Sequence, residues 1–362
     1  MSALLPEFPW DTLAEATAVA SAHPGGMVDL SVGTPVDPVA PVIRDALAAA
    51  SAAPGYPATA GTPALRAAAV AALSRRYGIT GLPDAAVLPV IGTKEFIAWL
   101  PTLLGLGPDR LVVVPELAYP TYEVGARLAG SAVLRADRPA ELDTAPPALV
   151  YLNSPSNPTG RVLDTGALRA TVGWAREHGV LLVSDECYLG LGWDAEPVSV
   201  LHPSVCDGDH AGLLAVHSLS KTSSLAGYRA GFVAGDPQLV AELLAVRKHA
   251  GMIVPTPVQA AMVAALDDDA HERAQRGRYA ARRAALLPAL AAAGFTVDQS
   301  HGGLYLWVTR GQPCRDTVNW LARRGILAAP GEFYGPAGAE HVRVALTATD
   351  ERIAAAAARL AG

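Results

Sequence analysis

The chain has little lysine, little cysteine and no long apolar run, and each shortage excludes a class of protein. Only three of its 28 basic residues are lysine, so a lysine at a given position stands out against arginine. The three cysteines are scattered, which excludes a disulfide framework and leaves no metal-ligand spacing. We therefore expect no metal. Gly, Pro or charged residues interrupt every apolar stretch well before the length of a membrane span, so we also expect no membrane partner.

The net charge and the first ten residues exclude further classes of protein. The net charge is −6 and no basic run occurs, which argues against a nucleic-acid partner. Residues 1–10 contain two prolines and lack the basic and apolar regions of a signal peptide. These features predict a cytoplasmic globular protein, and 362 residues are enough for two domains.

The spacing of short apolar runs predicts the fold class. Most runs are separated by helix-length segments, a pattern typical of a mostly parallel sheet with helices on both faces. They lie near residues 87–91, 110–114, 131–135, 148–152, 180–184, 212–217 and 229–234. About a dozen residues join the last two runs, which favours an antiparallel pair. From about residue 270 the pattern becomes α+β, so we predict a large domain over 36–269 and a smaller one formed by 1–35, with an N-terminal arm, and 270–362.

One lysine stands between the last two runs. Lys221 ends the segment Ser218-Leu219-Ser220-Lys221, and Arg229 follows eight residues later. A partly desolvated lysine can lose its proton and act as an amine nucleophile, which arginine cannot do. Taken alone, the motif is as consistent with a surface lysine on a loop.

Further motifs lie along the whole chain in a fixed order, and together they resemble the fold type I pyridoxal-phosphate aminotransferases. They are Gly33, Gly55-Tyr56 with residues 61–66, Gly92-Thr93-Lys94, Asn157-Pro158-Thr159-Gly160, Asp185 with Tyr188, the Lys221 segment and Arg343. The resemblance implies an α/β fold with a mostly parallel seven-stranded sheet and a smaller α+β domain. It also implies pyridoxal 5′-phosphate as cofactor, with an amino donor and a 2-oxo acid acceptor as substrates.

The resemblance assigns the catalytic roles to three residues. Lys221 holds the cofactor covalently as a Schiff base and then carries the proton as general base and acid. Asp185 lies beside the cofactor's ring nitrogen and raises its pKa by charge pairing, although a cap or turn aspartate is the alternative. Tyr188 and Asn157 bind the phenolate oxygen, where turn chemistry would explain Asn157 equally well.

The remaining roles concern the phosphate, the ring and the substrate. The resemblance implies that the phosphate is bound by Gly92, Thr93 and Lys94 at a helix start. Ser218, Ser220 and Arg229 bind it as well. Tyr56 resembles a tyrosine that reaches the phosphate in the neighbouring subunit, which implies a homodimer. Tyr119 stacks on the ring, with core packing as the alternative. Arg343 and Asn157 clamp the substrate carboxylate near Gly33, an edge-strand ion pair being the alternative for Arg343.

Two short segments resemble one subfamily. Residues 8–13 and 92–95 are similar to those of N-succinyldiaminopimelate aminotransferases of lysine biosynthesis, with Lys94 binding the distal acidic group. An aminotransferase for aspartate, aromatic amino acids or L,L-diaminopimelate and a β-eliminating enzyme are the alternatives. A non-enzymatic effector-binding domain is more remote, because a DNA-binding helix-turn-helix needs a basic face and the roughly 30 residues before Gly33 are acidic to neutral. We interpret His217 as a satisfied core histidine and Lys248 as part of a solvated helix face.

Overall fold

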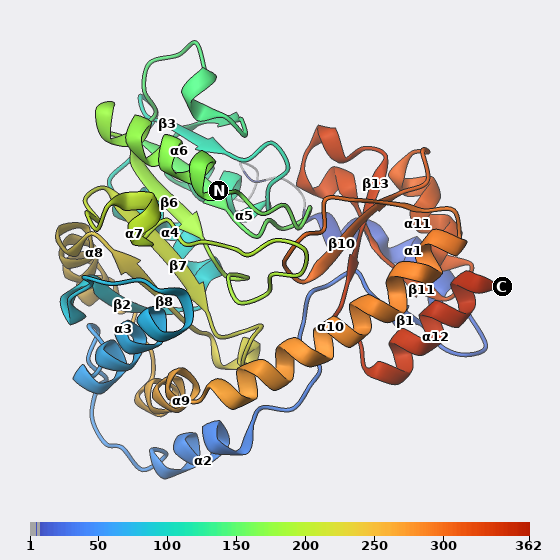
Figure 1. Ribbon diagram of the computed structural model, residues 1–362, viewed down its shortest axis with the longest axis horizontal. Helices are drawn as coiled ribbons and strands as arrows, with labels where there is room; N and C mark the ends of the chain where they lie inside the picture. The colour runs from blue at the N-terminus through green and yellow to red at the C-terminus, as the bar shows by residue number, and fades with distance from the viewer. Residues whose placement is uncertain (1–4, 6–7) are drawn as a thin grey trace.

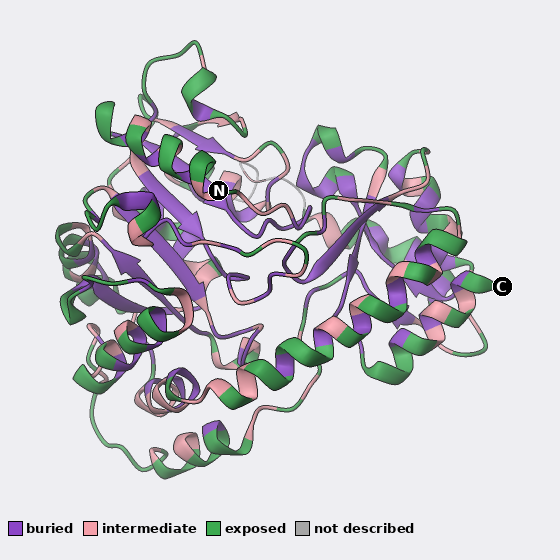
Figure 2. Cartoon of the chain, viewed as in Figure 1, coloured by how far each residue is buried: buried purple, intermediate pink, exposed green. Residues whose placement is uncertain are grey.

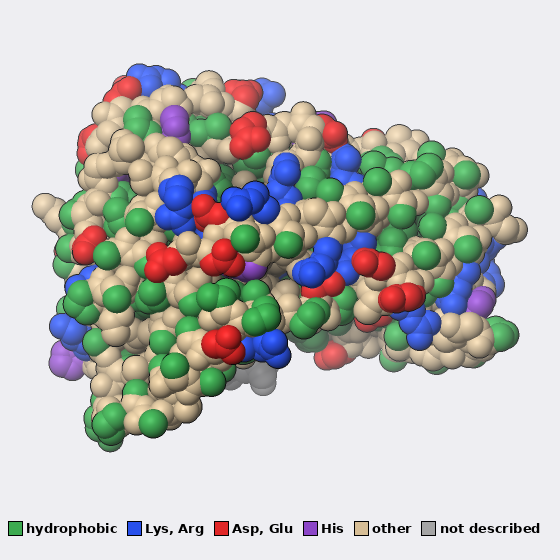
Figure 3. Space-filling view, turned by 60° about the horizontal axis from the view of Figure 1, so that its bottom comes forward, with side chains coloured by type: hydrophobic (Ala, Val, Ile, Leu, Met, Phe, Trp, Pro, Cys, Tyr) green, Lys and Arg blue, Asp and Glu red, His purple; other side chains and the backbone are tan. Residues whose placement is uncertain are grey.

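Two sheets with their covering helices build the molecule (Figure 1). The computed structural model describes residue 5 and residues 8–362. Residues 1–4 and 6–7, part of the predicted N-terminal arm, lie outside the described residues. Basic and acidic side chains are interspersed on the face drawn in Figure 3, in keeping with the small net charge of −6.

The larger sheet has seven strands in the order β2-β8-β7-β6-β5-β3-β4. They are β2 (Val87–Ile91), β3 (Leu111–Val114), β4 (Ala132–Arg135), β5 (Leu149–Asn153), β6 (Leu181–Asp185), β7 (Leu213–Ser218) and β8 (Ala230–Gly235). All pairs from β7 to β4 are parallel, whereas β8 runs antiparallel to both β7 and β2. The predicted mostly parallel seven-stranded sheet is confirmed, and so is its antiparallel β7–β8 pair.

Helices cover both faces of this sheet, which explains why central strands such as β5 and β8 are buried along their whole length (Figure 2). One face packs against α3 (Pro63–Tyr77), α6 (Thr165–Glu177), the short α7 (Pro203–Cys206) and α9 (Thr256–Asp267). The other face packs against α4 (Thr93–Leu103), α5 (Thr121–Leu128) and α8 (Pro237–Ala250). Helix α2 (Pro41–Ala49) lies on α9.

Local sequence sets the ends of these helices, as α3 shows. The hydroxyl of Thr62 accepts a hydrogen bond from the backbone N–H of Leu65 at 3.2 Å, and Pro63 follows as the first helical residue. Gly78 ends the helix in the left-handed conformation, with φ of 66°. Leu65 and Leu73 then face the core.

The smaller sheet is antiparallel and has the strand order β12-β13-β10-β9. Its strands are β9 (Thr296–Asp298), β10 (Tyr305–Thr309), β12 (Ala329–Pro330) and β13 (His341–Ala345), with β1 (Val28–Asp29) paired to β11 (Ile326–Leu327) beside it. The helices here are α1 (Ala14–Ser21), α10 (Asp269–Ala292), α11 (Cys314–Ala322) and α12 (Asp350–Ala361). Short 3-10 helices are η2 (Pro9–Leu13), η3 (Asp84–Ala86), η4 (Pro139–Glu141), η5 (Ala226–Tyr228), η6 (Gly331–Tyr334) and η7 (Pro336–Gly338).

The N-terminal segment packs with the C-terminal part of the chain. Leu13, Val28 and Leu30 share one buried cluster with residues of β10, β13 and α11. Helix α10 runs from the larger sheet's side of the molecule to the smaller sheet (Figure 1). The predicted domain boundaries near residues 36 and 270 stay a prediction.

Within residue 5 and residues 8–362, no helix is long and apolar enough to cross a bilayer. The same residues contain no group of three or more His, Cys, Asp or Glu side chains arranged to hold a metal ion.

Candidate active site

A cavity of about 470 Å³ lies at the carboxyl ends of the central strands. The last residues of β5, β6 and β7, which are Asn153, Asp185 and Ser218, all line it. The edge of an open α/β sheet beyond the carboxyl ends of its strands is where ligands of such folds bind. Of the fourteen predicted site residues, twelve line this cavity: Gly33, Thr93, Lys94, Tyr119, Asn157, Asp185, Tyr188, Ser218, Ser220, Lys221, Arg229 and Arg343.

Asp185 is a buried carboxylate held in a fixed orientation. Its Oδ2 accepts a hydrogen bond from the hydroxyl of Tyr122 at 2.7 Å, and its Oδ1 accepts one from the backbone N–H of Cys187 at 3.2 Å. Burial raises the pKa of Asp185 above its ordinary value, although the hydrogen bonds from Cys187 and Tyr122 act against this rise. A carboxylate in this setting is suited to pair with a cationic group in the cavity.

Lys221 brings an amine to the opposite wall of the cavity. Its Nζ donates a hydrogen bond to the backbone carbonyl of Gly33, and its own carbonyl accepts one from the hydroxyl of Tyr279 at 3.1 Å. A Cβ added to Gly33 would collide with the Tyr305 hydroxyl, so only glycine fits between the lysine and that ring. The N-terminal segment therefore closes directly over the lysine.

A cradle of donors surrounds the start of α4. Gly92 precedes the helix with φ of 76°, and a Cβ there would collide with Nη2 of Arg229. Arg229 is itself left-handed, with φ of 56°, and its Nη1 donates to the carbonyl of Ala226 at 2.9 Å. Ser218 Oγ accepts from the backbone N–H of Ser220 at 3.1 Å. A helix N-terminus, two hydroxyl groups and a guanidinium are the donor set that binds a phosphate. Gly92 lies beside Arg229 in this cradle although it does not line the cavity.

Arg343 is buried to 2 % exposure, and its guanidinium joins three distant segments. Nη1 donates to Oδ1 of Asn157 and Nη2 donates to the carbonyl of Ser31, both at 2.7 Å. The guanidinium carbon lies 3.9 Å from the ring centroid of Tyr305 and 4.9 Å from that of Tyr334. Its Nε has no partner among the described residues. The alternative of an edge-strand ion pair is wrong, because no carboxylate of residue 5 or residues 8–362 pairs with Arg343 and neutral partners hold it instead.

Tyr305 is a central residue of the site that sequence reasoning missed. Its hydroxyl lies 3.2 Å from that of Tyr188, and its ring stacks on Arg343. Burial alone would raise the pKa of Tyr305, but the positive charges of Arg343 and Lys221 outweigh it and hold this pKa below its ordinary value. A tyrosine on an apolar strand carries no sequence motif of its own.

Two tyrosines near the start of α5 have different surroundings, and the stacking predicted for Tyr119 stays a prediction. Tyr119 lies half-buried at the cavity, whereas Tyr122 is fully buried, stacks on Tyr151 at 5.0 Å between centroids and donates to Asp185. Asn153 was also missed: its side chain donates to the carbonyl of Asp185 at 2.9 Å and accepts from the N–H of Asn157 at 2.7 Å. Its position at the end of β5, in register with Asp185, is the signal that would have found it.

Aromatic rings and one lysine form the mouth of the cavity. The Nζ of Lys94 lies 5.7 Å from the ring centroid of Phe8 and 5.8 Å from that of Tyr119. Trp10 lines the same wall and packs on Phe8, with 5.5 Å between centroids. Tyr56, by contrast, is 99 % exposed on the segment between α2 and α3 and does not line the cavity of its own chain.

Comparison with known proteins assigns the chain to a family. Residues 25–360 match the family Aminotransferase class I and II. The probable aminotransferase Rv1178 of Mycobacterium tuberculosis is 79 % identical over 99 % of this chain and 86 % of its own length. The 4-dedimethylamino-4-oxo-anhydrotetracycline transaminase OxyQ of Streptomyces rimosus is 62 % identical over 98 % of this chain and 99 % of its own. The solved structure of a probable N-succinyldiaminopimelate aminotransferase from Thermus thermophilus superposes with a TM-score of 0.87 at 29 % identity, covering 98 % of this chain and 99 % of that one.

Proposed function

Since this chain belongs to the class I and II aminotransferases, we propose that it transfers the amino group between N-succinyl-L,L-2,6-diaminopimelate and 2-oxoglutarate. The products are N-succinyl-2-amino-6-oxopimelate and L-glutamate, and the reaction is a step of diaminopimelate and lysine biosynthesis. Enzymes of this family are pyridoxal 5′-phosphate-dependent transaminases with an amino donor and an oxo acid as substrates.

The observation that carries the proposal is the pair of cations lining one cavity. Arg343 is buried within it, and Lys94 stands exposed at its mouth between two rings. A substrate with a carboxylate at each end matches this arrangement, because Arg343 takes the α-carboxylate and Lys94 takes the succinyl carboxylate. The likeness to the Thermus thermophilus structure supports the same choice.

The residues of the cavity fit the cofactor of the family. The cradle at Gly92 leaves no room for a side chain beside Arg229, and its donors suit a phosphate. The buried carboxylate of Asp185 suits the protonated ring nitrogen, and Lys221 supplies the amine to which the aldehyde attaches. When bound, the cofactor delocalises the electron pair that remains after the substrate loses its α-proton.

The side chains then divide the work of the reaction. Asp185 keeps a proton on the ring nitrogen by charge pairing, and Tyr122 holds Asp185 in place. Once the substrate's amino group has displaced it, the freed Lys221 Nζ would take the α-proton of the substrate and return a proton to the carbon on the other side of the substrate nitrogen, as general base and then general acid. The guanidinium of Arg343 orients the substrate carboxylate, with Asn157 fixing its plane at 2.7 Å.

The remaining assignments complete the proposal. Tyr188 and Asn157 donate to the phenolate oxygen, and Tyr119 covers the ring. Tyr56 reaches the phosphate of a second copy of the chain, which its 99 % exposure permits. We therefore propose a homodimer. A monomer of full activity in size-exclusion chromatography would overturn it.

A spectroscopic half-reaction tests the proposed substrate. The purified protein is mixed with glutamate or with N-succinyldiaminopimelate, and the visible absorbance of the bound cofactor is followed. We expect both donors to remove the absorbance and 2-oxoglutarate to restore it. A response to glutamate without a response to the succinylated donor would keep the aminotransferase and reject this substrate.

One observation favours a second candidate. Phe8, Trp10 and Tyr119 give the mouth of the cavity three aromatic faces, and the relative from Streptomyces rimosus is a transaminase of an anhydrotetracycline. A ketone on a fused-ring compound is thus the alternative acceptor for this chain. With the protein first loaded with amino groups by glutamate, return of the absorbance on adding such a ketone, but not on adding the succinylated oxo acid, would select it.

Replacing Lys94 by alanine tests the distal contact. We expect KM for N-succinyldiaminopimelate to rise about 3- to 10-fold, because a partly solvated charge contact is weak. KM for a donor without a distal charge, such as alanine, should stay unchanged, as should the cofactor absorbance. Lys248→Ala on the exposed end of α8 is the matched control. An unchanged KM for the succinylated donor would remove Lys94 from the proposal.

Replacing Gly92 by alanine tests the phosphate cradle. The new methyl group collides with the Arg229 guanidinium, so we expect the dissociation constant of pyridoxal 5′-phosphate to rise at least about 10-fold. Gly105→Ala is a close control, because Gly105 has a similar φ of 67° with no described neighbour within 4 Å of an added Cβ. Equal cofactor binding by the two variants in fluorescence titration would contradict the assignment.

A further inference from the structure

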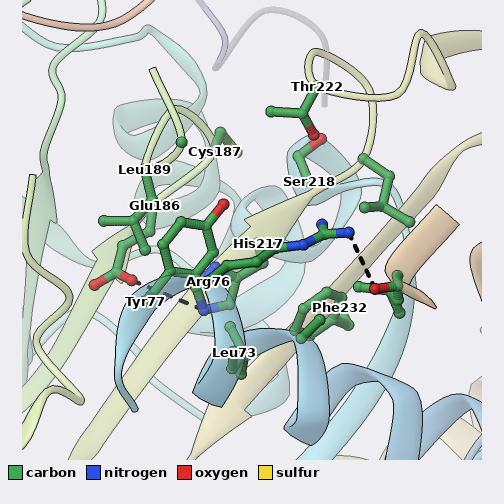
Figure 4. Close-up of a pocket in the computed structure, with 14 residues that line it drawn as sticks. Leu73, Arg76, Tyr77, Glu186, Cys187, Leu189, His217, Ser218, Thr222 and Phe232 are labelled. Atoms are coloured by element: carbon green, nitrogen blue, oxygen red, sulfur yellow. Dashed lines mark hydrogen bonds and ion pairs between the residues drawn. The ribbon is translucent and has the colours of Figure 1, made fainter. Parts of the chain in front are cut away.

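A second, much smaller cavity lies behind the Asp185 layer (Figure 4). It measures about 30 Å³, and residues of α3, of β7 and of the segment after β6 line it. This volume holds one ordered water, provided that polar atoms are present to bind it. The side chain of Asp185 faces the large cavity, whereas the next side chain, Glu186, faces the small one.

Two buried polar atoms in this cavity have no partner. Oε1 of Glu186 accepts from the backbone N–H of Val200 at 2.9 Å. Its Oε2 and Nε2 of His217 lie 3.8 Å apart, and neither makes a hydrogen bond within the part of the chain that the structure describes. Figure 4 shows the carboxylate directed toward the imidazole. His217 is a core residue as predicted, but it is not a satisfied one. Buried polar atoms without partners commonly mark a bound water.

The surroundings favour a neutral state for both groups. Burial raises the pKa of Glu186 to about 7, although hydrogen bonds from Ser199, Val200 and Ser184 act against this rise. Burial lowers the pKa of His217 to about 3. The titratable and charged groups around the pair are Asp185 and Cys187 on the Glu186 segment, Arg76 and Tyr77 on α3, and Glu272 on α10. Arg76 is already paired with Asp269 at 2.7 Å and with Glu272 at 2.6 Å, so its charge is compensated on the side away from Glu186.

We infer that Glu186 is kept neutral beside Asp185: protonated, it donates through one ordered water to Nε2 of His217, and its neutrality leaves Asp185 the only anion of the two neighbouring carboxyl groups. Water accepts from the carboxyl O–H and donates one of its own hydrogens to the imidazole nitrogen, so both unpartnered atoms are satisfied. The inference rests on the proposed placing of the ring nitrogen at Asp185, and it is independent of the substrate.

Loss of the Glu186 proton has a consequence for its neighbour. A second carboxylate beside Asp185 raises the proton affinity of both groups by like-charge repulsion. Because the pKa of Glu186 lies above its unfolded value, its contribution to folding stability is full below about pH 4.5 and is lost as pH rises through about 7. His217 is common to the native protein and to a Glu186 variant, so their difference isolates this carboxyl group.

The test compares the native protein with Glu186→Gln, which keeps the shape and a donor but cannot ionise. We expect the variant to gain roughly 3–6 °C in Tm relative to the native protein between about pH 5 and about pH 8. In the holoenzyme we expect the absorbance of the bound cofactor to change with pH near 7, and this change to vanish in the variant. Glu177→Gln, an exposed glutamate at the end of α6, is the control and should follow the native protein.

Carbon-13 NMR of the apoprotein labelled at the glutamate carboxyl carbons decides the matter without cofactor or substrate. One resonance of the native protein should titrate near pH 7, and it should be missing in Glu186→Gln. Absence of any glutamate resonance that titrates above about pH 6 overturns the inference even if the variant fails to fold. A high-resolution crystal structure without a water between Oε2 and Nε2 would also overturn it. Neither measurement depends on whether the succinylated substrate is correct.

Discussion

Replacing Lys221 by arginine is expected to abolish transamination without unfolding the protein. Arginine keeps the positive charge, but its guanidinium neither attaches the cofactor nor moves a proton at neutral pH. General base catalysis by a positioned side chain contributes about 100- to 10,000-fold to the rate, so kcat should fall at least about 100-fold. The visible absorbance of lysine-bound cofactor should be lost as well. Stopped-flow absorbance with glutamate and a coupled assay of kcat measure both effects.

The control for this variant uses the same exchange elsewhere in the chain. Lys248→Arg lies on the exposed last turn of α8 and should behave as the native protein. The phosphate cradle of the Lys221 variant is intact, so pyridoxal 5′-phosphate should still bind to it reversibly. Retention of more than about a tenth of native kcat would show that another group carries the proton.

Replacing Arg343 by lysine should have the second largest effect. The guanidinium is fixed by Asn157 and Ser31 at 2.7 Å each and packed against Tyr305, whereas an ammonium cannot reproduce this planar fork. Disturbing a buried, hydrogen-bonded charge contact costs about 2 kcal/mol or more, which is about 30-fold or more in kcat/KM. The loss should be similar for glutamate and for 2-oxoglutarate, because both substrates carry the same carboxylate.

A second measurement separates substrate binding from general damage. The dissociation constant of pyridoxal 5′-phosphate should stay near its native value in Arg343→Lys, because no hydrogen bond among the described residues joins Arg343 to the phosphate cradle. Arg323→Lys, on the exposed end of α11, serves as the matched control. An unchanged kcat/KM for both substrates would show that the α-carboxylate binds elsewhere.

The sequence was informative wherever local pattern decides structure. Short apolar runs gave the strands of the large sheet, and the polar residues that follow them, such as Asp185 and Ser218, lie at the cavity because parallel strands end at one edge. The antiparallel β7–β8 pair followed from the shortness of its connection. These inferences need only periodicity and chain length.

Contacts between distant segments could not be read in the same way. Tyr305 acts through Tyr188 and Arg343, which only tertiary packing brings together. Whether Tyr119 or Tyr122 faces the cavity depends on the orientation of α5, and the structure uses both side chains. The unpartnered atoms of Glu186 and His217 are likewise invisible in sequence, since burial alone makes them unusual.

The three-way attachment of Arg343 has a consequence for biosynthesis of the chain. Its partners Ser31 and Asn157 leave the ribosome first, and one of these hydrogen bonds spans 312 residues. The cradle residues between Gly92 and Arg229 are synthesised long before Arg343, so a nascent chain can assemble the proposed phosphate site before the proposed carboxylate site. Contacts of such long range form late in folding. The proposed site for the substrate α-carboxylate is therefore completed after the phosphate cradle.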